Sequence, residues 1–579
     1  MYQLKRIKVL LVTCMLASAS LWAQDTKISL TSATAKATSE QGGNEAVSSV
    51  IDGNYGKIWH SQWSGGAVFD SKSSVDLTIA LSEVTLVDYV RYIPRQDQNN
   101  GRWDEVEVFY SPNITGTNFI SIGTFNLNYA DIPHDFFLNG TEGVSCGQIK
   151  FTIRSGSNNH ASAAEIEMYQ IDKTKLNAFA QCFSDAVYTE LKPGVTSSSI
   201  ADADVRALVQ SMQSDPTSYK KFRVGEYEAY ETIWTLQQRL KTKNPYSRYE
   251  NPTGVYFTAG QSYLVAVSGI EDDAVGLKVK NWYQSESSST YSLRNGLNYI
   301  TATTEGNVFV NYYTDNYAEA PKVKIHFINA PVIGYWNQKT MTNSDWVALL
   351  ADKASDDHRI IITQSEHAQT AFPISAWKTH CRTDVETLMG HYQDVQWAIR
   401  DMMGLEKYGY QTRNRQIFYV VNGGFMAAGD EGAYCDYADL GGIMNANSFD
   451  FWGVGHEWGH NNQIDPGFHW SGCGETTNNI YASWAQYHFT ASRDAEGNPY
   501  NLRLEDEESG IDEYAKMRGG RMQVYFEEAL RKGVAWQLQD GPDYHNATPN
   551  TITVTGRDAD GNDIGQVTTT SRNYDHFVK

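Results

Sequence analysis

The pattern of hydrophobic and polar positions predicts a β-rich beginning of the chain. Between residues 24 and 172, short runs such as "VDLTIAL", "DEVEVFYS" and "IKFTIRS" are rich in β-branched and aromatic residues, and Gly, Asn and Ser separate them. Such runs are typical of strands. Their regular spacing predicts an antiparallel β-sandwich over 24–172.

The pattern changes further along the chain. Apolar residues recur at spacings of three and four over 173–245, which predicts helices that link two larger units. Period-two runs such as "VGLKVKNWY" predict a small β domain over 246–332, and helical patterns then dominate 333–579, with "QIFYVVNGG" as one buried strand. Because 579 residues exceed what one core usually holds, we predict a multidomain α+β protein.

The first 23 residues have the pattern of an export signal, a basic "MYQLKRIK" followed by an apolar "VLLVTCMLASASLWA". We therefore predict a signal peptide over 1–23 and a protein that is secreted or held at the cell surface, the bacterial periplasm included. Cys14 in the apolar run makes lipid attachment a less favoured alternative. No later stretch is long and apolar enough to predict a transmembrane helix.

Composition limits the partners and the cross-links. The net charge of -21 argues against nucleic acid and acidic membranes as partners. Without the signal peptide an odd number of widely spaced cysteines remains, which is not the pattern of a disulfide framework. The pair that flanks the histidine motif, Cys435 and Cys473, is the best candidate for a single bridge.

The stretch "GHEWGHNNQIDPGFHWSGCGETTNNIYASW", residues 455–484, carries the candidate chemistry. His456 and His460 are four residues apart, so on a helix both imidazoles lie on one face and can converge on one zinc ion. Glu457 lies about 100° round the helix, beside the metal, where a base for the hydrolytic water belongs. A structural helix with incidental histidines and a zinc-binding but inactive protein are the alternatives.

A catalytic zinc site needs a third ligand and one open position. Glu475 follows a loop that contains Gly and Pro and begins a predicted second helix, so it is the preferred third ligand. His469, inside the loop, is the competing candidate. Asn479, one helical turn after Glu475, is placed to orient one of the two histidines.

Three ordered motifs of the predicted sandwich, "SVIDGNYGKIWHSQWS", "VRYIPRQDQNNGRWDEVEVFYS" and "SAAEIEMY", resemble the factor five/eight type C (discoidin) domain. This is the jelly roll of carbohydrate-binding module family thirty-two. The resemblance implies a structural calcium ion held by Asp52, Asn54 and Glu165, and loop oxygens suit such a hard cation. The alternative is that Asp52 and Asn54 only form a turn and that Glu165 is a solvated charge.

The same resemblance implies a glycan site on the loops at one end of the sandwich. Planar polar groups give the directional bonds that sugar hydroxyls need, and an aromatic ring covers the C–H surface of the sugar. The residues implied are His60, Arg95 and Asn100, with Trp63 or His160 as the platform. The glycans implied are galactose and N-acetylgalactosamine, and a purely structural role of Arg95 is the alternative.

The motif "HEWGHNNQ" followed by "GETTNNIYA" resembles the enhancin-like, mucin-degrading metallopeptidases, family M-sixty of the gluzincins, over residues 246–579. The resemblance implies a mainly helical catalytic domain over 333–579, zinc held by His456, His460 and Glu475, and Glu457 as the catalytic acid/base. The family cleaves glycoprotein backbones next to O-glycosylated Ser or Thr, which implies a secreted zinc endopeptidase that acts on mucin-like glycoproteins.

Two alternative functions stay open at this point. The protein could be a catalytically inert glycan-binding adhesin, or a general zinc protease that is indifferent to glycans. We also expect further helical sequence after "TSRNYDHFVK", so the catalytic domain either continues beyond Lys579 or is short.

The donor that would stabilise the oxyanion is not identified. The candidates that are near in sequence are Tyr434, Tyr437 and Tyr481, and the alternative for each is that it packs in the core.

Overall fold

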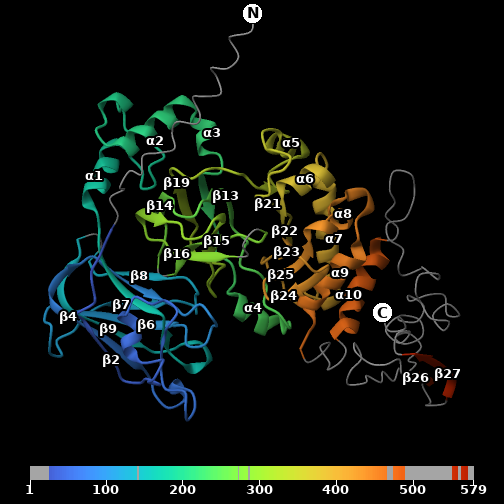
Figure 1. Cartoon of the computed structure of the whole chain (residues 1–579), viewed down its shortest axis with the longest axis horizontal. Helices are drawn as coiled ribbons and strands as arrows, with labels where there is room; N and C mark the ends of the chain where they lie inside the picture. The colour runs from blue at the N-terminus through green and yellow to red at the C-terminus, as the bar shows by residue number, and fades with distance from the viewer. Residues whose placement is uncertain are drawn as a thin grey trace, which may run out of the picture. The chain divides into compact units, whose positions relative to one another are not determined.

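The computed structural model describes residues 25–139, 142–271, 273–283, 287–465 and 474–489, with the backbone of two further strands at 551–557 and 563–570. The predicted signal peptide, His469 and Cys473 lie outside these residues. The chain divides into two compact units (Figure 1). The first comprises the chain up to Tyr219 with 260–267 and 294–301, and the second comprises the rest.

The N-terminal part of the first unit is a β-sandwich, as predicted. One antiparallel sheet has the order β2-β4-β9-β6-β7 and the other β1-β11-β5-β8, while β3 and β10 form a separate pair. The strands are β1 (Thr26–Lys27), β2 (Thr34–Ala37), β3 (Trp59–His60), β4 (Val75–Val87), β5 (Tyr89–Ile93), β6 (Glu105–Ser111), β7 (Ile120–Asn126), β8 (His134–Phe137), β9 (Val144–Ile153), β10 (Ser162–Ala163) and β11 (Glu165–Gln170).

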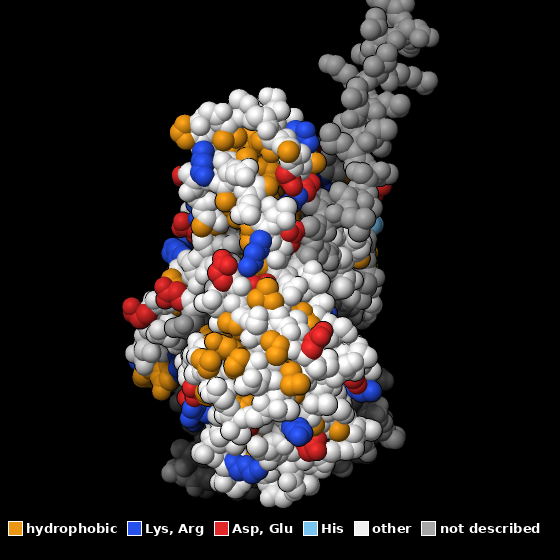
Figure 2. Space-filling model, turned by 90° about the vertical axis from the view of Figure 1, so that its left-hand side faces the viewer, with side chains coloured by type: hydrophobic (Ala, Val, Ile, Leu, Met, Phe, Trp, Pro, Cys, Tyr) orange, Lys and Arg blue, Asp and Glu red, His pale blue; other side chains and the backbone are white. Residues whose placement is uncertain are grey.

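The core of the sandwich follows from alternation along its strands. The first seven residues of β4 alternate between buried and half-buried positions, so that Leu77 and Ile79 face inward. They share one core with Phe151 of β9 and with Val90 and Ile166 of the other sheet. One face of each sheet is therefore apolar, which is typical of an antiparallel sandwich. On the face of the molecule in Figure 2, acidic and basic side chains are scattered singly among uncharged ones.

The segment predicted to be helical contains four helices, which are α1 (Lys173–Cys182), α2 (Ala203–Ser214), α3 (Pro216–Lys220) and α4 (Ile233–Leu240). Asp172 and Asp202 cap α1 and α2 by accepting backbone N–H bonds, as N-cap carboxylates commonly do. A strand, β12 (Val224–Tyr227), interrupts the helices and pairs with β19 (Val323–Phe327) in the second unit.

Two antiparallel strands from the middle of the chain group with the first unit, apart from Ser268. They are β14 (Ser262–Ser268) and β17 (Gly296–Thr301), which pair although two strands of another sheet lie between them in the sequence. Arg294, just before β17, forms a 2.6 Å ion pair with Asp25. Its guanidinium also lies 5.0 Å from the ring centroid of Tyr89 and 5.7 Å from that of Phe137, both in the sandwich. Because Arg294 is almost fully buried, these contacts fasten this strand pair to the sandwich.

The second unit contains two further sheets. The first has the order β13-β18-β15-β16, with β13 (Pro252–Phe257), β15 (Val275–Lys280), β16 (Ser288–Ser292) and β18 (Gly306–Tyr312). The second is a mixed sheet of order β20-β21-β22-β23-β25-β24, formed by β20 (Trp336–Asn337), β21 (Ile360–Gln364), β22 (Ala368–Pro373), β23 (Gln416–Val421), β24 (Met426–Gly429) and β25 (Gly432–Asp436). Only β23 corresponds to a strand predicted from the sequence of this region.

Helices lie beside the mixed sheet (Figure 1). They are α5 (Asn343–Ala351), α6 (Ile374–His380), α7 (Val385–Met403), α8 (Gly441–Met444), α9 (Phe451–Asn462) and α10 (Gly474–Phe489). Helix α7 contacts β22, α9 and α10. Tyr392 of α7, Phe418 of β23 and Trp458 of α9 meet in one fully buried core. The multidomain α+β architecture is therefore confirmed.

None of the helices in the described part of the chain is long and apolar enough to cross a membrane. The four cysteines within the described residues, Cys146, Cys182, Cys381 and Cys435, are buried free thiols. The predicted bridge from Cys435 to Cys473 cannot be followed, because Cys473 is outside these residues.

Candidate active site

Helix α9 is held in a fixed orientation against the mixed sheet. The Asp450 side chain caps it by accepting the Gly453 N–H at 2.9 Å. On the face toward β23, the Trp458 indole N–H donates to the Ile417 carbonyl at 3.2 Å and the Asn462 amide donates to Gln416 at 2.8 Å. These buried bonds fix the rotation of the helix about its axis, and with it the direction of the two histidines.

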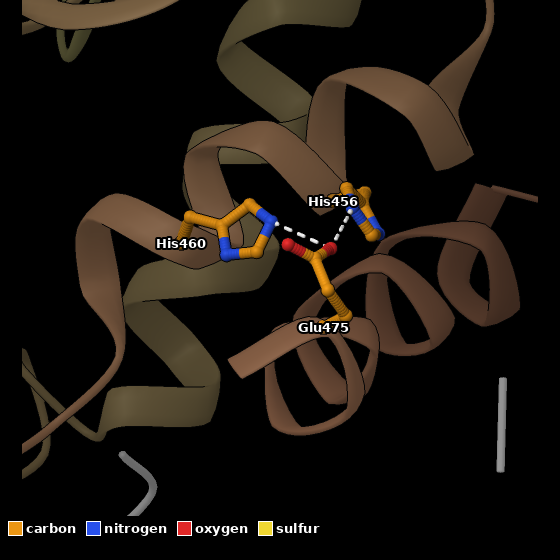
Figure 3. A group of neighbouring side chains, drawn as sticks. All are labelled: His456, His460 and Glu475. Carbon is orange, nitrogen blue, oxygen red and sulfur yellow. Dashed lines mark hydrogen bonds and ion pairs between the residues drawn. The ribbon is translucent and has the colours of Figure 1, made fainter. Parts of the chain in front are cut away.

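Two glycines of α9 allow α10 to come unusually close. A Cβ atom on Gly455 would lie 3.0 Å from the Cα of Ala482, and one on Gly459 would lie 2.6 Å from the Asn478 carbonyl oxygen. Only glycine fits where two backbones approach to this degree. The close contact brings the first turn of α10, with Glu475, beside the histidines of α9 (Figure 3).

His456, His460 and Glu475 converge on one point. Glu475 Oε2 lies 3.3 Å from His456 Nε2 and 3.1 Å from His460 Nε2, and the ligand atoms of the three residues lie within 4.8 Å of one another. Zinc binds nitrogen and oxygen at about 2.0 to 2.2 Å, so two ligands of a tetrahedral site are about 3.3 Å apart. The donor set and these spacings fit a zinc ion, and Glu475, whose side chain is 47% exposed, leaves one side open.

Two asparagines of α10 contact the histidines of the site. Asn479 Nδ2 donates to the Glu475 carbonyl at 2.7 Å, which points Asn479 Oδ1 toward His456 Nδ1, 2.7 Å away. His456 therefore donates from Nδ1 and keeps the lone pair of Nε2 for a metal. The sequence analysis missed Asn478, whose Nδ2 lies 2.9 Å from His460 Nε2. Its position next to Asn479 and three residues after Glu475 was the available signal.

Glu457 lies beside the three donors without joining them. It is buried, with Oε1 4.0 Å from His456 Nε2. Burial raises the pKa of Glu457, although the neighbouring histidines partly oppose this effect. Gly453 and Asn461, four residues to either side, touch Met426 and Gly429 of β24. Glu457 thus shares the face of α9 that is turned toward β24.

The neighbouring groups in the site change the pKa values of Glu475 and His456. Hydrogen bonds from His456 and His460 hold the pKa of Glu475 well below its usual range. Burial alone would lower the pKa of His456, but its bond to Glu475 and the charge of Glu457 outweigh burial and raise the pKa. The site therefore concentrates negative charge where a cation would bind.

Strand β24 is the edge of the mixed sheet and runs along α9. Among the described strands it pairs only with β25. The Asp436 N–H donates to the Phe425 carbonyl at 2.8 Å, and hydrogen-bonded pairs alternate along an antiparallel ladder. Met426 and Ala428 therefore direct their N–H and C=O groups away from β25. This open edge lies next to the helix face that carries Glu457.

Comparisons with known proteins agree with this geometry. Residues 333–535 match the family model of peptidase M60, enhancin and enhancin-like, and residues 34–166 match that of the F5/8 type C domain. The chain joins an M60 peptidase domain to an F5/8 type C domain. Both resemblances inferred from the sequence are thereby confirmed.

Solved structures are similar to parts of this chain. A metallopeptidase from Bacteroides thetaiotaomicron is 24% identical, with a TM-score of 0.50 over 56% of this chain and 57% of that one. A metallopeptidase in complex with Tn antigen is 24% identical (TM-score 0.43, covering 47% of this chain and 53% of that one). The CBM32-1, CBM32-2 and M60 catalytic domains of Clostridium perfringens ZmpB are 18% identical (TM-score 0.44, 85% and 55%). The chain thus spans little more than half the length of these structures.

The three tyrosines considered as oxyanion donors have structural partners. The Tyr481 hydroxyl is buried and donates to the Asn462 carbonyl at the end of α9 at 2.9 Å. The Tyr437 hydroxyl lies 3.0 Å from Ser375 Oγ. Tyr434, on β25, packs its ring 5.5 Å from that of Tyr419. These contacts agree with the packing role that was the alternative for all three.

In the F5/8 type C domain, the predicted calcium loop lies next to Glu165. Glu165 Oε2 accepts the Gly53 N–H at 3.1 Å. Asp52 Oδ1 accepts the Asn54 N–H at 2.8 Å, and Asn54 Oδ1 accepts the Gly56 N–H at 3.1 Å. The structure brings the loop and Glu165 together, and the side chains of the loop make turn bonds. A calcium-binding role stays a prediction.

The predicted glycan residues of the F5/8 type C domain gather at one end of the β3–β10 pair. The rings of His60 and His160 are 5.1 Å apart. The backbone carbonyl of Asn100 accepts a bond from the Ser162 hydroxyl, and Ser162 lies opposite His60 in the pair. Arg95 is buried and held by two bonds to Asp97, at 2.8 and 2.6 Å. The Trp63 ring is half exposed, and its indole N–H donates to Glu45.

This cluster contains polar atoms without partners. His60 Nε2, Asn100 Oδ1 and His160 Nδ1 are buried and have no hydrogen-bond partner among the described residues. Burial of a polar atom without a partner is costly, so such atoms commonly mark a place where a ligand or water binds. Burial also lowers the pKa of His60 and of His160, which favours neutral imidazoles that both donate and accept.

Proposed function

We propose that the protein is a secreted zinc endopeptidase that hydrolyses the backbone of O-glycosylated, mucin-like proteins next to glycosylated Ser or Thr. The observation that carries the proposal is the convergence of His456, His460 and Glu475 on one point. The buried carboxyl of Glu457 lies beside them, and the open edge of β24 lies next to the helix face that carries Glu457. The match to the M60 family supports hydrolysis of peptides. The F5/8 type C domain supports glycan binding.

The substrate would bind as an added strand. Met426 and Ala428 offer outward N–H and C=O groups, which an extended peptide can pair with antiparallel. Such pairing uses the backbone of the substrate and is indifferent to most side chains. A peptide on this edge would pass along the helix face of Glu457, within reach of the three donor residues.

The chemistry divides between the metal and the chain. When bound, a zinc ion supplies Lewis-acid polarisation of the scissile carbonyl and lowers the pKa of a water molecule. Glu457 accepts the proton of the attacking water and delivers it to the nitrogen of the leaving amine. Its burial suits this role, because a raised pKa makes the carboxyl a better proton acceptor than an exposed glutamate. Asn479 holds His456 in the tautomer that binds metal.

The F5/8 type C domain would hold the enzyme on its substrate. We propose that His60, Arg95, Asn100 and His160 bind galactose or N-acetylgalactosamine, and that Asp52, Asn54 and Glu165 bind calcium. The three unpartnered polar atoms of the glycan cluster support the first assignment. A sugar-bound module raises the effective concentration of peptidase on a substrate with many glycans.

One comparison tests the function. The purified protein is incubated with a mucin-type glycoprotein and with the same protein after enzymatic removal of its O-glycans, and Glu457→Gln is the matched control. We expect cleavage of the glycosylated form only, a decrease of about 10² to 10⁴-fold in Glu457→Gln with zinc retained, and loss of both zinc and activity in His456→Ala.

Three outcomes would contradict the proposal or a part of it. Equal cleavage of both substrates would indicate a general zinc protease. Cleavage of neither substrate by a zinc-loaded protein would indicate a glycan-binding adhesin. Parent activity in the Glu457→Gln variant would show that another group takes the proton.

A further inference from the structure

A buried cluster of charges lies at the turn that follows β24. Lys278 and Lys280 are two residues apart on β15, so both side chains point to the same face, and both are almost fully buried. Lys280 Nζ lies 2.6 Å from Glu431 Oε2, and Lys278 Nζ lies 3.8 Å from Glu431 Oε1. The Tyr249 hydroxyl donates to Glu431 Oε1 at 2.8 Å.

These contacts hold the Glu431 side chain firmly. Buried ammonium groups are costly unless a carboxylate and hydrogen bonds compensate for the lost water. Lys278 also lies 5.0 Å from the centroid of the Tyr249 ring, a cation–π contact. Burial would raise the pKa of Glu431, but the two lysines outweigh it and keep the carboxyl ionised. Displacing the turn would therefore expose or unpair three buried polar side chains.

The turn controls the position of β24. Glu431 lies between β24 and β25, two residues after Gly429. The Gly429 carbonyl accepts bonds from Asn461 of α9 at 2.9 Å and from Asn244 at 3.4 Å. At the other end of the strand, Met426 packs on Gly453 of α9. The strand has only four residues and lacks a neighbour on its outer side among the described strands, so these end contacts determine where its edge lies.

We infer that Glu431 is a positioning residue for peptide binding, held in place by Lys278, Lys280 and Tyr249. Through the turn it sets the distance of the open edge of β24 from Glu457, and thereby the alignment of an extended substrate with the hydrolytic site. This inference rests on the proposed function. It assigns to the β sheet that contains β15 a part in substrate binding, although none of its residues belongs to the metal site.

The experiment compares Glu431→Gln with the parent on two glycopeptides. One is long enough to extend along β24, and the other is a minimal peptide around the same glycosylated residue. We expect the KM for the long peptide to rise between about tenfold and a hundredfold, because a displaced edge of β24 would lose about two backbone hydrogen bonds to the peptide. The KM for the minimal peptide, kcat and zinc content should change little.

Two controls separate positioning from general stability. Glu231→Gln removes another buried ion pair, in which Arg239 bonds to Glu231 at 2.9 and 2.6 Å, and should leave both KM values unchanged. Lys280→Met should reproduce the KM change of Glu431→Gln, while Lys280→Arg should restore the parent value. If Glu431→Gln does not fold, the KM of Lys280→Met for the long peptide tests the inference instead.

The outcomes distinguish this inference from the function on which it rests. A parent protein that cleaves neither glycopeptide contradicts the function, and the inference with it. A parent that cleaves both, with variants that lower the melting temperature but leave the KM of the long peptide unchanged, contradicts only the inference, because the cluster would then be a structural tether.

Discussion

Glu165 is a carboxyl group that the F5/8 type C domain buries almost completely. It is 2% exposed and lies near two other carboxylates, Asp52 and Glu167. Burial is the main cause that raises its pKa, from 4.5 to about 7, and the two carboxylates add to the effect. In the absence of a cation, Glu165 therefore gains or loses its proton near neutral pH. A bound calcium ion would favour the ionised form.

This environment predicts a specific pH dependence of stability. Because the pKa is higher in the folded state, protonated Glu165 contributes stability that is fully present below about pH 4.5 and is lost as the pH rises through about 7. In calcium-free buffer, the melting temperature should fall over this range more steeply for the parent than for Glu165→Gln. Calcium should reverse the loss at pH 7.5 in the parent only. Identical pH profiles for parent and variant would contradict the assignment.

The metal-site residues show what could be predicted from the sequence at this scale. A spacing of four residues on a helix directs His456 and His460 to one side in almost any fold, so these two and Glu457 were predictable. Glu475 was chosen over His469 because it begins a helix. The place of Asn478, three residues after Glu475, indicates only that it is near the site, because its contact with His460 depends on how α10 is rotated against α9. Only the packed structure contains that information.

At the scale of elements, the distance between α9 and α10 decides whether three ligands can meet. Gly459→Ala would place a methyl group 2.6 Å from the Asn478 carbonyl oxygen. We expect the helices to separate, with a loss of about 1 to 3 kcal/mol in the free energy of unfolding and at least a tenfold loss of zinc affinity. Metal titration and thermal unfolding measure the two effects.

Gly390→Ala is the matched control. Gly390 is also inside a helix, α7, but a Cβ atom there would meet no atom within 4 Å. Alanine should therefore be neutral or stabilise the protein by up to about 1 kcal/mol, with zinc affinity unchanged. If Gly459→Ala bound zinc as tightly as Gly390→Ala, the spacing of the helices would not govern the site.

Of the strands in the mixed sheet, the sequence pattern predicted only β23. β21 and β22 are buried along their whole length, so they show no alternation of apolar and polar residues. β24 has the sequence "MAAG", without β-branched or aromatic residues. It is a strand because β25 and α9 flank it. The element that matters most for the proposed substrate binding therefore has the weakest sequence signal.

At the scale of the whole molecule, the proposed function joins glycan binding to peptide hydrolysis. His160→Ala, in the glycan cluster, should slow cleavage of an intact mucin by about tenfold or more, since tethering to many glycans strongly increases effective affinity. Cleavage of a short glycopeptide should stay at the parent rate, because one small substrate gains nothing from a tether. Progress curves on both substrates measure the difference.

The control for this prediction removes an aromatic side chain elsewhere. Tyr408 is 66% exposed and belongs to the second unit, so Tyr408→Ala should leave both rates unchanged. Equal slowing of mucin and glycopeptide cleavage by His160→Ala would indicate an effect on catalysis or folding instead of tethering.

Segment boundaries illustrate what the sequence alone leaves open at this scale. The strand pattern of 246–332 was recognised as β structure, yet residues 260–267 and 294–301 group with the first unit and the rest with the second. One contact within the first unit that is distant in sequence is the ion pair of Arg294 with Asp25. No pattern of apolar and polar residues within either segment indicates such a pairing.

The same ion pair has a consequence for protein engineering. Sugar-binding modules are attractive parts to exchange between enzymes when they are treated as structurally independent of the rest of the chain. Here a foreign module would leave the Arg294 guanidinium buried without a carboxylate and without the rings of Tyr89 and Phe137. A chimera with a new glycan preference would therefore have to carry an equivalent acid and aromatic pair, or replace Arg294 with an apolar residue.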